Sequence, residues 1–293
     1  MSLPRSCYAA YSAAIALLLF AGWASAAGQQ KDYEDFGAAK FDHSTAITNE
    51  WCPLQPGTRF TWDGSAIDEE GDTERHSSTF TVTDLTKVIA GVRTVVCWDR
   101  GIVDGELEES ELIFFAQDNN GNVWQLGEYP EEYDDGKFDK APCWMQGVGD
   151  GRAGIMMPAK PKPGAASYSE GWSPSIKFTD RAVVDQMGQT TKVPSGSYDN
   201  VLVIDEWDQE EPNAHQLKYY ARGVGNVRVG WRGEGNKDHE ELELIKIEQL
   251  SADDLAKARE DALQLERSAY EHSKDVFANT KPSEHATASA GAR

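Results

Sequence analysis

Beyond its first residues, the sequence has no long apolar run. The apolar stretch at 13–20 is too short to cross a bilayer, which takes about 20 residues in a helix. It is followed by Ala24-Ser25-Ala26, the small-x-small pattern typical of a cleavage site. These features predict a secretory signal over residues 1–26, cleaved near Ala26, and a periplasmic or secreted protein. A retained membrane anchor is the alternative, and no membrane span is expected in the mature chain.

Basic residues are scarce: 28 Lys and Arg stand against 49 Asp and Glu, which gives a net charge of -21. This balance opposes binding to nucleic acid and to anionic lipid, because both select for clusters of Lys and Arg. The expected partner is therefore a small-molecule or cationic ligand. Acidity that only keeps an exported protein soluble is the alternative. The sequence leaves the oligomeric state open.

Cysteine is also rare, with Cys52, Cys97 and Cys143 outside the predicted signal. An odd number allows at most one internal disulfide in an oxidising compartment. Cys52 and Cys143 are the predicted pair because both lie in loop-like stretches next to proline, whereas Cys97 lies within an apolar strand pattern. Three reduced thiols are the alternative.

Several catalytic and metal-binding patterns are missing. The chain has no Gly-x-Ser-x-Gly, no phosphate loop, no dinucleotide fingerprint, no CxxC and no closely spaced histidines. We therefore expect no cofactor, and whether the protein is an enzyme stays uncertain. The stretch 118–122, DNNGN, resembles the start of a calcium loop but lacks the later glutamate, so a hairpin turn is predicted. The acidic turn at 131–135 would hold Ca²⁺ weakly at most.

Strand patterns fill the chain between residues 51 and 250. Short segments rich in β-branched and aromatic residues alternate with turn signals, and no βαβ texture occurs. The predicted fold is mainly β: a strongly curved antiparallel sheet or β-barrel, lipocalin-like in shape, with one C-terminal α-helix. A long Pro/Gly-rich stretch at 142–175 is predicted to be a loop or lid near a cavity mouth.

The flanking segments are predicted as follows. Residues 27–50 form an extended leader that packs Phe36 and Phe41 on the domain edge. Ser251 with Asp254 fits a capping box, which opens a helix over residues 251–279. The weakly apolar stripe of this helix favours docking on its own sheet over docking on another chain. Residues 280–293 are predicted to be a disordered tail.

Residues 92–133 are predicted to form three consecutive strands because Asp104-Gly105 and Asn120-Gly121 are strong hairpin signals. Two-residue turns at these positions fix a register, and a four-residue second turn leaves the faces unchanged. One face then carries Trp98, Arg100, Glu109, Glu111, Ile113, Phe115, Trp124, Leu126 and Glu128. The other carries Val95, Cys97, Asp99, Leu112, Phe114, Val123 and Tyr129.

The segment PLQPGTRFTWDG at 53–64 has a Pro-Leu, a Gly and an aromatic-x-aromatic strand, and YYARGVGNVRVG at 219–230 has a Gly-Val-Gly hairpin. Both segments resemble an uncharacterised family of secreted or periplasmic bacterial β-rich proteins. The middle of the chain, from TDLTKVIAGVRTVV to GEYPEEY, is similar to the same kind of protein. The resemblance implies a strongly curved sheet or barrel, and it implies no activity or catalytic residue.

The candidate ligand site combines carboxylates and aromatic rings on one strand face. Its predicted residues are Trp98, Arg100, Glu111, Trp124, Glu128, His215 and Tyr220. Glu111 and Glu128 lie on adjacent strands, where two carboxylates bind a cation or share a proton. An outward lattice of Glu and Arg is the alternative for this face, and a structural histidine is the alternative for His215. An exported binding protein is the leading hypothesis. A hydrolase or isomerase using the two glutamates, or an envelope protein acting through the C-terminal helix, are the others.

Overall fold

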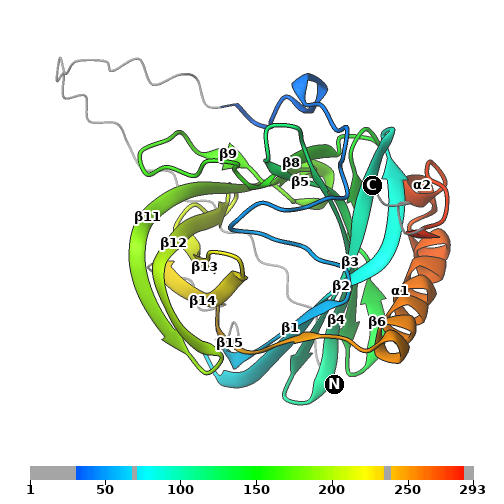
Figure 1. Ribbon diagram of the computed structural model, residues 1–293. Helices are drawn as coiled ribbons and strands as arrows, with labels where there is room; N and C mark the ends of the chain where they lie inside the picture. Colours follow the sequence, from blue (N-terminus) through cyan, green and yellow to red (C-terminus); the bar gives the residue numbers. More distant parts are fainter. Residues whose placement is uncertain (1–30, 68–70, 234–238, 287–293) are drawn as a thin grey trace, which may run out of the picture. The chain divides into compact units, whose positions relative to one another are not determined.

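The computed structural model describes residues 31–67, 71–233 and 239–286. The predicted signal, and the last residues of the predicted tail, lie outside the described residues. Antiparallel strands dominate the rest, and they form a strongly curved sheet with one long C-terminal helix, as the sequence predicts (Figure 1). Among the described residues, no helix is both long and apolar enough to span a membrane.

The longer strands form the body of the sheet. They are β1 (Thr58–Ile67), β2 (Thr73–Ile89), β3 (Val92–Val103), β4 (Glu106–Gln117), β5 (Val123–Asp134), β8 (Arg152–Met157), β11 (Asp180–Val193), β12 (Gly196–Asp208), β13 (Ala214–Ala221), β14 (Gly225–Gly233) and β15 (His239–Gln249). The short strands are β6 (Lys137–Lys140), β7 (Trp144–Met145), β9 (Tyr168–Ser169), β10 (Gly171–Trp172) and β16 (Glu284–His285). The helices are η1 (Phe36–Ala38), η2 (Pro174–Ile176), α1 (Ala252–His272) and α2 (Lys274–Phe277).

The two ends of the sheet meet in one chain segment. The hydrogen-bonded order runs β10-β8-β5-β4-β3-β2-β1-β15-β14-β13-β12-β11-β9. Only Glu170 separates β9, at one end of this path, from β10, at the other. We call residues 168–172 the seam. The sheet curls until its two edges are joined covalently there, although no ladder pairs β9 with β10 (Figure 1).

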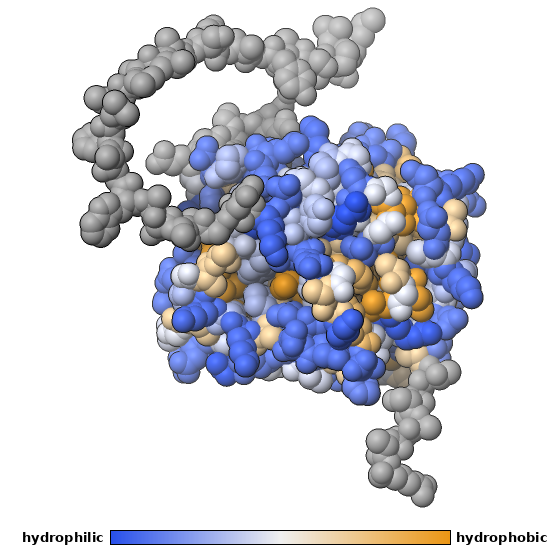
Figure 2. All heavy atoms as spheres, turned by 90° about the horizontal axis from the view of Figure 1, so that it is seen from above, coloured by the Kyte–Doolittle hydropathy of each residue, from blue (hydrophilic) through white to orange (hydrophobic). Residues whose placement is uncertain are grey.

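The curl gives the sheet a concave and a convex side, each with its own apolar cluster. The concave cluster includes Val82, Phe115 and Leu202, together with Ile47 and Trp51 from the segment that precedes β1. Burial of these side chains favours curvature of the sheet around that segment. Polar side chains cover most of the face seen in Figure 2, with apolar residues gathered across its middle.

The convex cluster lies between the sheet and α1. The small stripe Ala258, Ala262 and Ala269 packs with Leu265 against strand residues such as Phe114. Small side chains let the helix approach the sheet closely. The predicted docking of the helix on its own sheet is confirmed. The Ser251 side chain accepts a hydrogen bond from the Asp254 N–H, so the predicted cap is also confirmed.

The chain segments before β1 and after β15 are more ordered than the sequence suggests. Phe36 and Phe41 contact the Trp124 ring, with centroids 5.6 and 6.3 Å away, as expected for the leader. The single helix predicted here is two helices in the structure: α1 ends at His272, and α2 follows it. The prediction of a disordered tail is wrong for its described part, because β16 pairs with β2.

Two further predictions are corrected. The Pro/Gly-rich stretch at 142–175 is not a lid, since it carries β7 to β10 and completes the sheet. All three described cysteines are free. Cys52 packs on the concave cluster and Cys143 belongs to the convex one, so the sheet separates the two thiols that were predicted to pair.

Candidate functional site

The concave side encloses a cavity of about 940 Å³. Among the described residues that line it are twelve acidic side chains, against one lysine, Lys218, and one histidine, His76. Seven of these acids have a raised pKa and form what we call the acidic band: Asp99, Glu109, Glu111, Glu128, Glu170, Asp180 and Glu206. The band runs from β3, β4 and β5 to the strands on the opposite side of the curled sheet.

Glu111 and Glu128 face this cavity together. Glu111 lies opposite Pro130 and Ile113 opposite Glu128, which brings the two carboxyl groups together. Burial raises the pKa of Glu128 to about 8, helped by the nearby Asp180, while a hydrogen bond from Gln125 Nε2 at 2.6 Å opposes the rise. Burial and then the charge of Glu128 hold the pKa of Glu111 well above its ordinary value. At neutral pH this pair therefore retains a proton.

The predicted companions of this pair lie on the other side of the sheet. Trp98 and Trp124 belong to the convex cluster, where their indole N–H groups donate to Ser110 Oγ at 3.0 Å and Asp118 Oδ2 at 2.9 Å. Arg100 lies beside Trp98 in a smaller cavity of about 250 Å³ at α1. The prediction that these three side chains share a face with the glutamates is wrong.

Two bulges and one turn explain why these side chains were predicted on the wrong face. Gly101 pairs with Glu109 and Ile102 with Leu107, so Glu108 is an extra residue in β4. One extra residue moves every later side chain of that strand to the opposite face. The second turn spans five residues, with Gln117 opposite Val123.

A second bulge, at Gly127 in β5, then restores the pairing of Ile113 with Glu128. Gly127 has φ 154°, and a Cβ there would collide with the Trp144 backbone carbonyl. The turn and this bulge cancel for Glu128 but not for Trp124, which precedes the bulge.

Asp99 and Glu109 extend the band along the same wall. Burial raises the pKa of Asp99 to about 6, although Ser78 Oγ and the Arg100 N–H donate to its Oδ1 at 2.7 and 2.8 Å. Burial and the charge of Asp99 raise the pKa of Glu109 to about 7. Asp99 was predicted on the face opposite these glutamates, and the β4 bulge is what brings it to them.

The opposite wall holds acids that the sequence reasoning missed. Burial, followed by the charge of Asp208, raises the pKa of Asp180 to about 6. Glu206 Oε2 lies 2.6 Å from Lys218 Nζ. The strand pattern gave one signal, because Glu206 alternates with Leu202 and Ile204 on one face of β12. Its position across the cavity from Glu128 depends on the curl of the sheet, which no local pattern encodes.

Aromatic rings line the cavity between these walls. The Phe60 and Trp62 rings stack with centroids 5.7 Å apart, Phe60 lies 6.3 Å from Phe80, and Phe80 lies 6.4 Å from Phe115. All four border the cavity. The cavity therefore combines an apolar aromatic row with a band of acids.

The remaining two predicted site residues have different outcomes. Tyr220 lines the cavity and is 2% exposed. His215 does not line it: its Nδ1 lies 2.7 Å from Asp205 Oδ1, and Asp205 also pairs with Arg232. His215 is thus held by hydrogen bonds at the strand edge, which agrees with the structural alternative.

The acids suggested for calcium have other partners. Asp118 Oδ1 accepts from the Asn120 and Asn122 N–H groups, both at 2.9 Å, so the DNNGN stretch is a capped hairpin turn. Glu131 accepts from the Tyr129 and Tyr133 hydroxyls, both at 2.6 Å. Within the described ranges, no three His, Cys, Asp or Glu side chains are grouped as a metal site.

No protein-family model matches the sequence, and no curated protein matches it either. Among solved structures, the chain is similar to a Bacteroides fragilis protein inferred to be exported and having a YmcC-like fold. The identity is 15%, the TM-score 0.39, and the match covers 68% of this chain and 99% of that one. It is also similar to a Parabacteroides distasonis protein inferred to be a lipoprotein, at 11% identity and TM-score 0.36, with 68% and 99% covered.

Proposed function

We propose that this is an exported binding protein whose concave cavity holds an organic cation with an apolar portion. The observation that carries the proposal is the acidic band, seven carboxyl groups with raised pKa that face one cavity. Export is supported by the N-terminal sequence pattern at residues 1–26.

Electrostatics favour a positively charged ligand. A buried carboxyl group either keeps its proton or needs a positive partner. The lining supplies Lys218, already paired with Glu206, and His76, which pairs with Glu240. A ligand ammonium would stabilise the ionised form of Glu128 and its neighbours.

The aromatic row indicates what else the ligand carries. Phe60, Trp62, Phe80 and Phe115 offer apolar faces that bury hydrocarbon, and aromatic faces also attract ammonium groups. A divalent metal ion fits less well, because it needs several oxygens that converge on one point. The acids here are distributed over both walls of a cavity of about 940 Å³. A chain molecule with amino groups matches that distribution.

Linear alkyl diamines of graded length, with the neutral diols of equal length as controls, test this proposal. Titration followed by tryptophan fluorescence and calorimetry is expected to show saturable binding of diamines and none of diols. Glu111→Gln combined with Glu128→Gln should weaken diamine binding roughly tenfold or more, since charge-assisted hydrogen bonds are lost. A matched double variant of exposed acids, Glu241→Gln with Glu271→Gln, should bind as wild type does. Equal binding of diamines and diols would contradict the proposal.

A further inference from the structure

Buried polar atoms that make no hydrogen bond to any other protein atom lie at the seam and on strands β12 and β13. Four such atoms are the hydroxyl oxygens of Tyr168 and Tyr220 and the Oε1 atoms of Glu170 and Glu206. Their residues are 9%, 2%, 5% and 7% exposed, respectively. Unpaired buried polar atoms are rare because each loses its hydrogen bonds to water. Four of them in one region indicate a place for polar groups of a ligand.

The strand register brings these atoms to one area of the concave wall. Ala182 pairs with Tyr168 on one side and with Glu206 on the other, so both side chains share its face. Tyr168 lies in β9 and Glu170 in the bend that follows it, close enough for the charge of Glu170 to act on Tyr168. Tyr220 lies opposite Leu202, on the face of β12 that carries Glu206.

The electrostatics agree with this grouping. Burial, and then the charges of Glu170 and Glu206, hold the pKa of Tyr168 well above its ordinary value, and the same causes raise the pKa of Tyr220. Burial, followed by the charges of Glu206 and Asp180, raises the pKa of Glu170. The charge of Lys218 opposes this rise. Cys52, in the segment that precedes β1, also raises the pKa of Tyr220.

We propose that Tyr168, Glu170, Glu206 and Tyr220 form a subsite for a primary ammonium group of the ligand. The inference rests on the proposed function and names the end of the ligand that this wall recognises. A primary ammonium has three N–H donors, and the subsite presents two carboxyl oxygens and two hydroxyl oxygens as acceptors. A quaternary ammonium has no donor and would leave all four atoms unpaired. Binding of the primary ammonium ionises Glu170, whose proton passes to the solvent.

The test compares a linear primary diamine with its fully N-methylated counterpart. Wild type is expected to bind the primary diamine at least about tenfold more tightly, because unpaired buried acceptors cost affinity. In Glu170→Gln and in Tyr220→Phe the preference should fall to about threefold or less, since the first variant removes the charge that strengthens the N–H contacts and the second removes an acceptor. Tyr219→Phe, which removes a hydroxyl outside the cavity lining, should keep the wild-type preference. Circular dichroism of each variant confirms that it is folded.

The outcomes separate this inference from the proposed function. If diamines bind wild type but the preference is unchanged in both Glu170→Gln and Tyr220→Phe, the subsite is wrong and the cationic cavity stands. If wild type binds no diamine, both are wrong. A crystal structure of the diamine complex with only water at these four atoms would also overturn the subsite.

Discussion

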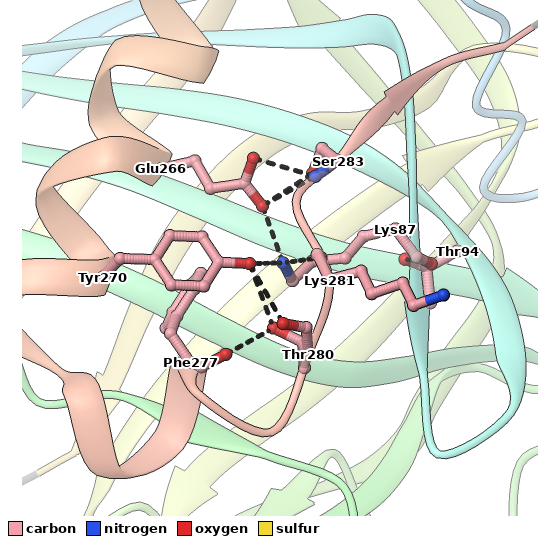
Figure 3. Close-up of polar contacts among 8 residues, drawn as sticks. All are labelled: Lys87, Thr94, Glu266, Tyr270, Phe277, Thr280, Lys281 and Ser283. Atoms are coloured by element: carbon pink, nitrogen blue, oxygen red, sulfur yellow. Dashed lines mark hydrogen bonds and ion pairs between the residues drawn. The ribbon is translucent and has the colours of Figure 1, made fainter.

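Lys87 Nζ lies 2.7 Å from Glu266 Oε1, and the two side chains are only 0% and 4% exposed. The pair joins β2 to α1 on the convex side of the sheet (Figure 3). Lys87 Nζ also donates to the Tyr270 hydroxyl at 3.2 Å and to the Lys281 carbonyl at 2.8 Å. Glu266 accepts from the Ser283 N–H and hydroxyl, so one buried ion pair anchors both the helix and the chain that follows it.

Lys87→Met should therefore lower the free energy of unfolding by about 3–5 kcal/mol, because it leaves the Glu266 carboxylate buried without its cation. The double variant Lys87→Met with Glu266→Gln should lose less than the sum of the single changes. Lys257→Met is the matched control, since its ion pair with Asp261 is exposed and contributes less than about 1 kcal/mol. Urea unfolding of Lys87→Met, Glu266→Gln, the double variant and Lys257→Met measures these effects, and additive effects of the two single changes would contradict the coupling.

The acidic band predicts how stability depends on pH. The folded-state pKa of Glu128, about 8, lies above its ordinary value of 4.5, so the folded protein holds a proton that the unfolded chain has released. The stabilisation is complete below about pH 4.5 and is lost as the pH rises through about 8. Unfolding free energy should thus fall across this interval, by at most about 1.4 kcal/mol per pH unit for one such group.

Glu128→Gln should flatten this pH profile, because an amide does not titrate. Glu241→Gln, an exposed change of the same kind, should leave the slope as in wild type. Denaturant titrations at a series of pH values give the slopes directly. A Glu128→Gln profile parallel to that of wild type would show that Glu128 is not the protonated group.

The seam predicts a stability effect at one glycine. A Cβ at Gly154 would collide with the backbone of Glu170 and Gly171, which passes directly over β8. Gly154→Ala should lower the free energy of unfolding by roughly 1–3 kcal/mol, as overpacking does. At Gly37 a Cβ would make only an ordinary contact, so Gly37→Ala serves as the control. Equal thermal stability of the two variants would argue against a tightly packed seam.

The cysteines give a direct chemical prediction. Cys97 and Cys143 are buried, and burial raises the pKa of both thiols, which suppresses their reactive thiolate form. A thiol reagent should label neither in the native protein and all three cysteines, including Cys52, after unfolding without reductant. Recovery of a peptide pair linked through Cys52 and Cys143 would overturn the arrangement of the two apolar clusters.

How far the sequence predicts this structure depends on the range of the interaction. The turn at Asp104-Gly105, the cap at Ser251 and the small stripe on α1 are local signals, and each is found where it was predicted. Glu111 and Glu128 lie together as predicted, but only because the longer second turn and the bulge at Gly127 cancel each other. Trp98 fell on the wrong face because a single bulged residue, Glu108, reverses the alternation.

The far wall of the cavity was beyond sequence reasoning. Glu170 and Glu206 act together only because the sheet curls until its edges meet at the seam. That curvature is set by the summed twist of many strands and by the segment packed inside them. No spacing in the chain indicates that a residue in a Pro/Gly-rich stretch would complete an acidic wall.

The central claim, that the acidic band binds an organic cation, is tested most directly by calorimetric titration of wild type with a linear diamine at neutral pH. The titration is carried out in two buffers that differ in ionisation enthalpy. Because Glu128 and Glu111 hold protons in the free protein, binding should release protons, and the observed heat should differ between the buffers accordingly. Absence of binding, or a heat independent of the buffer, would contradict the account.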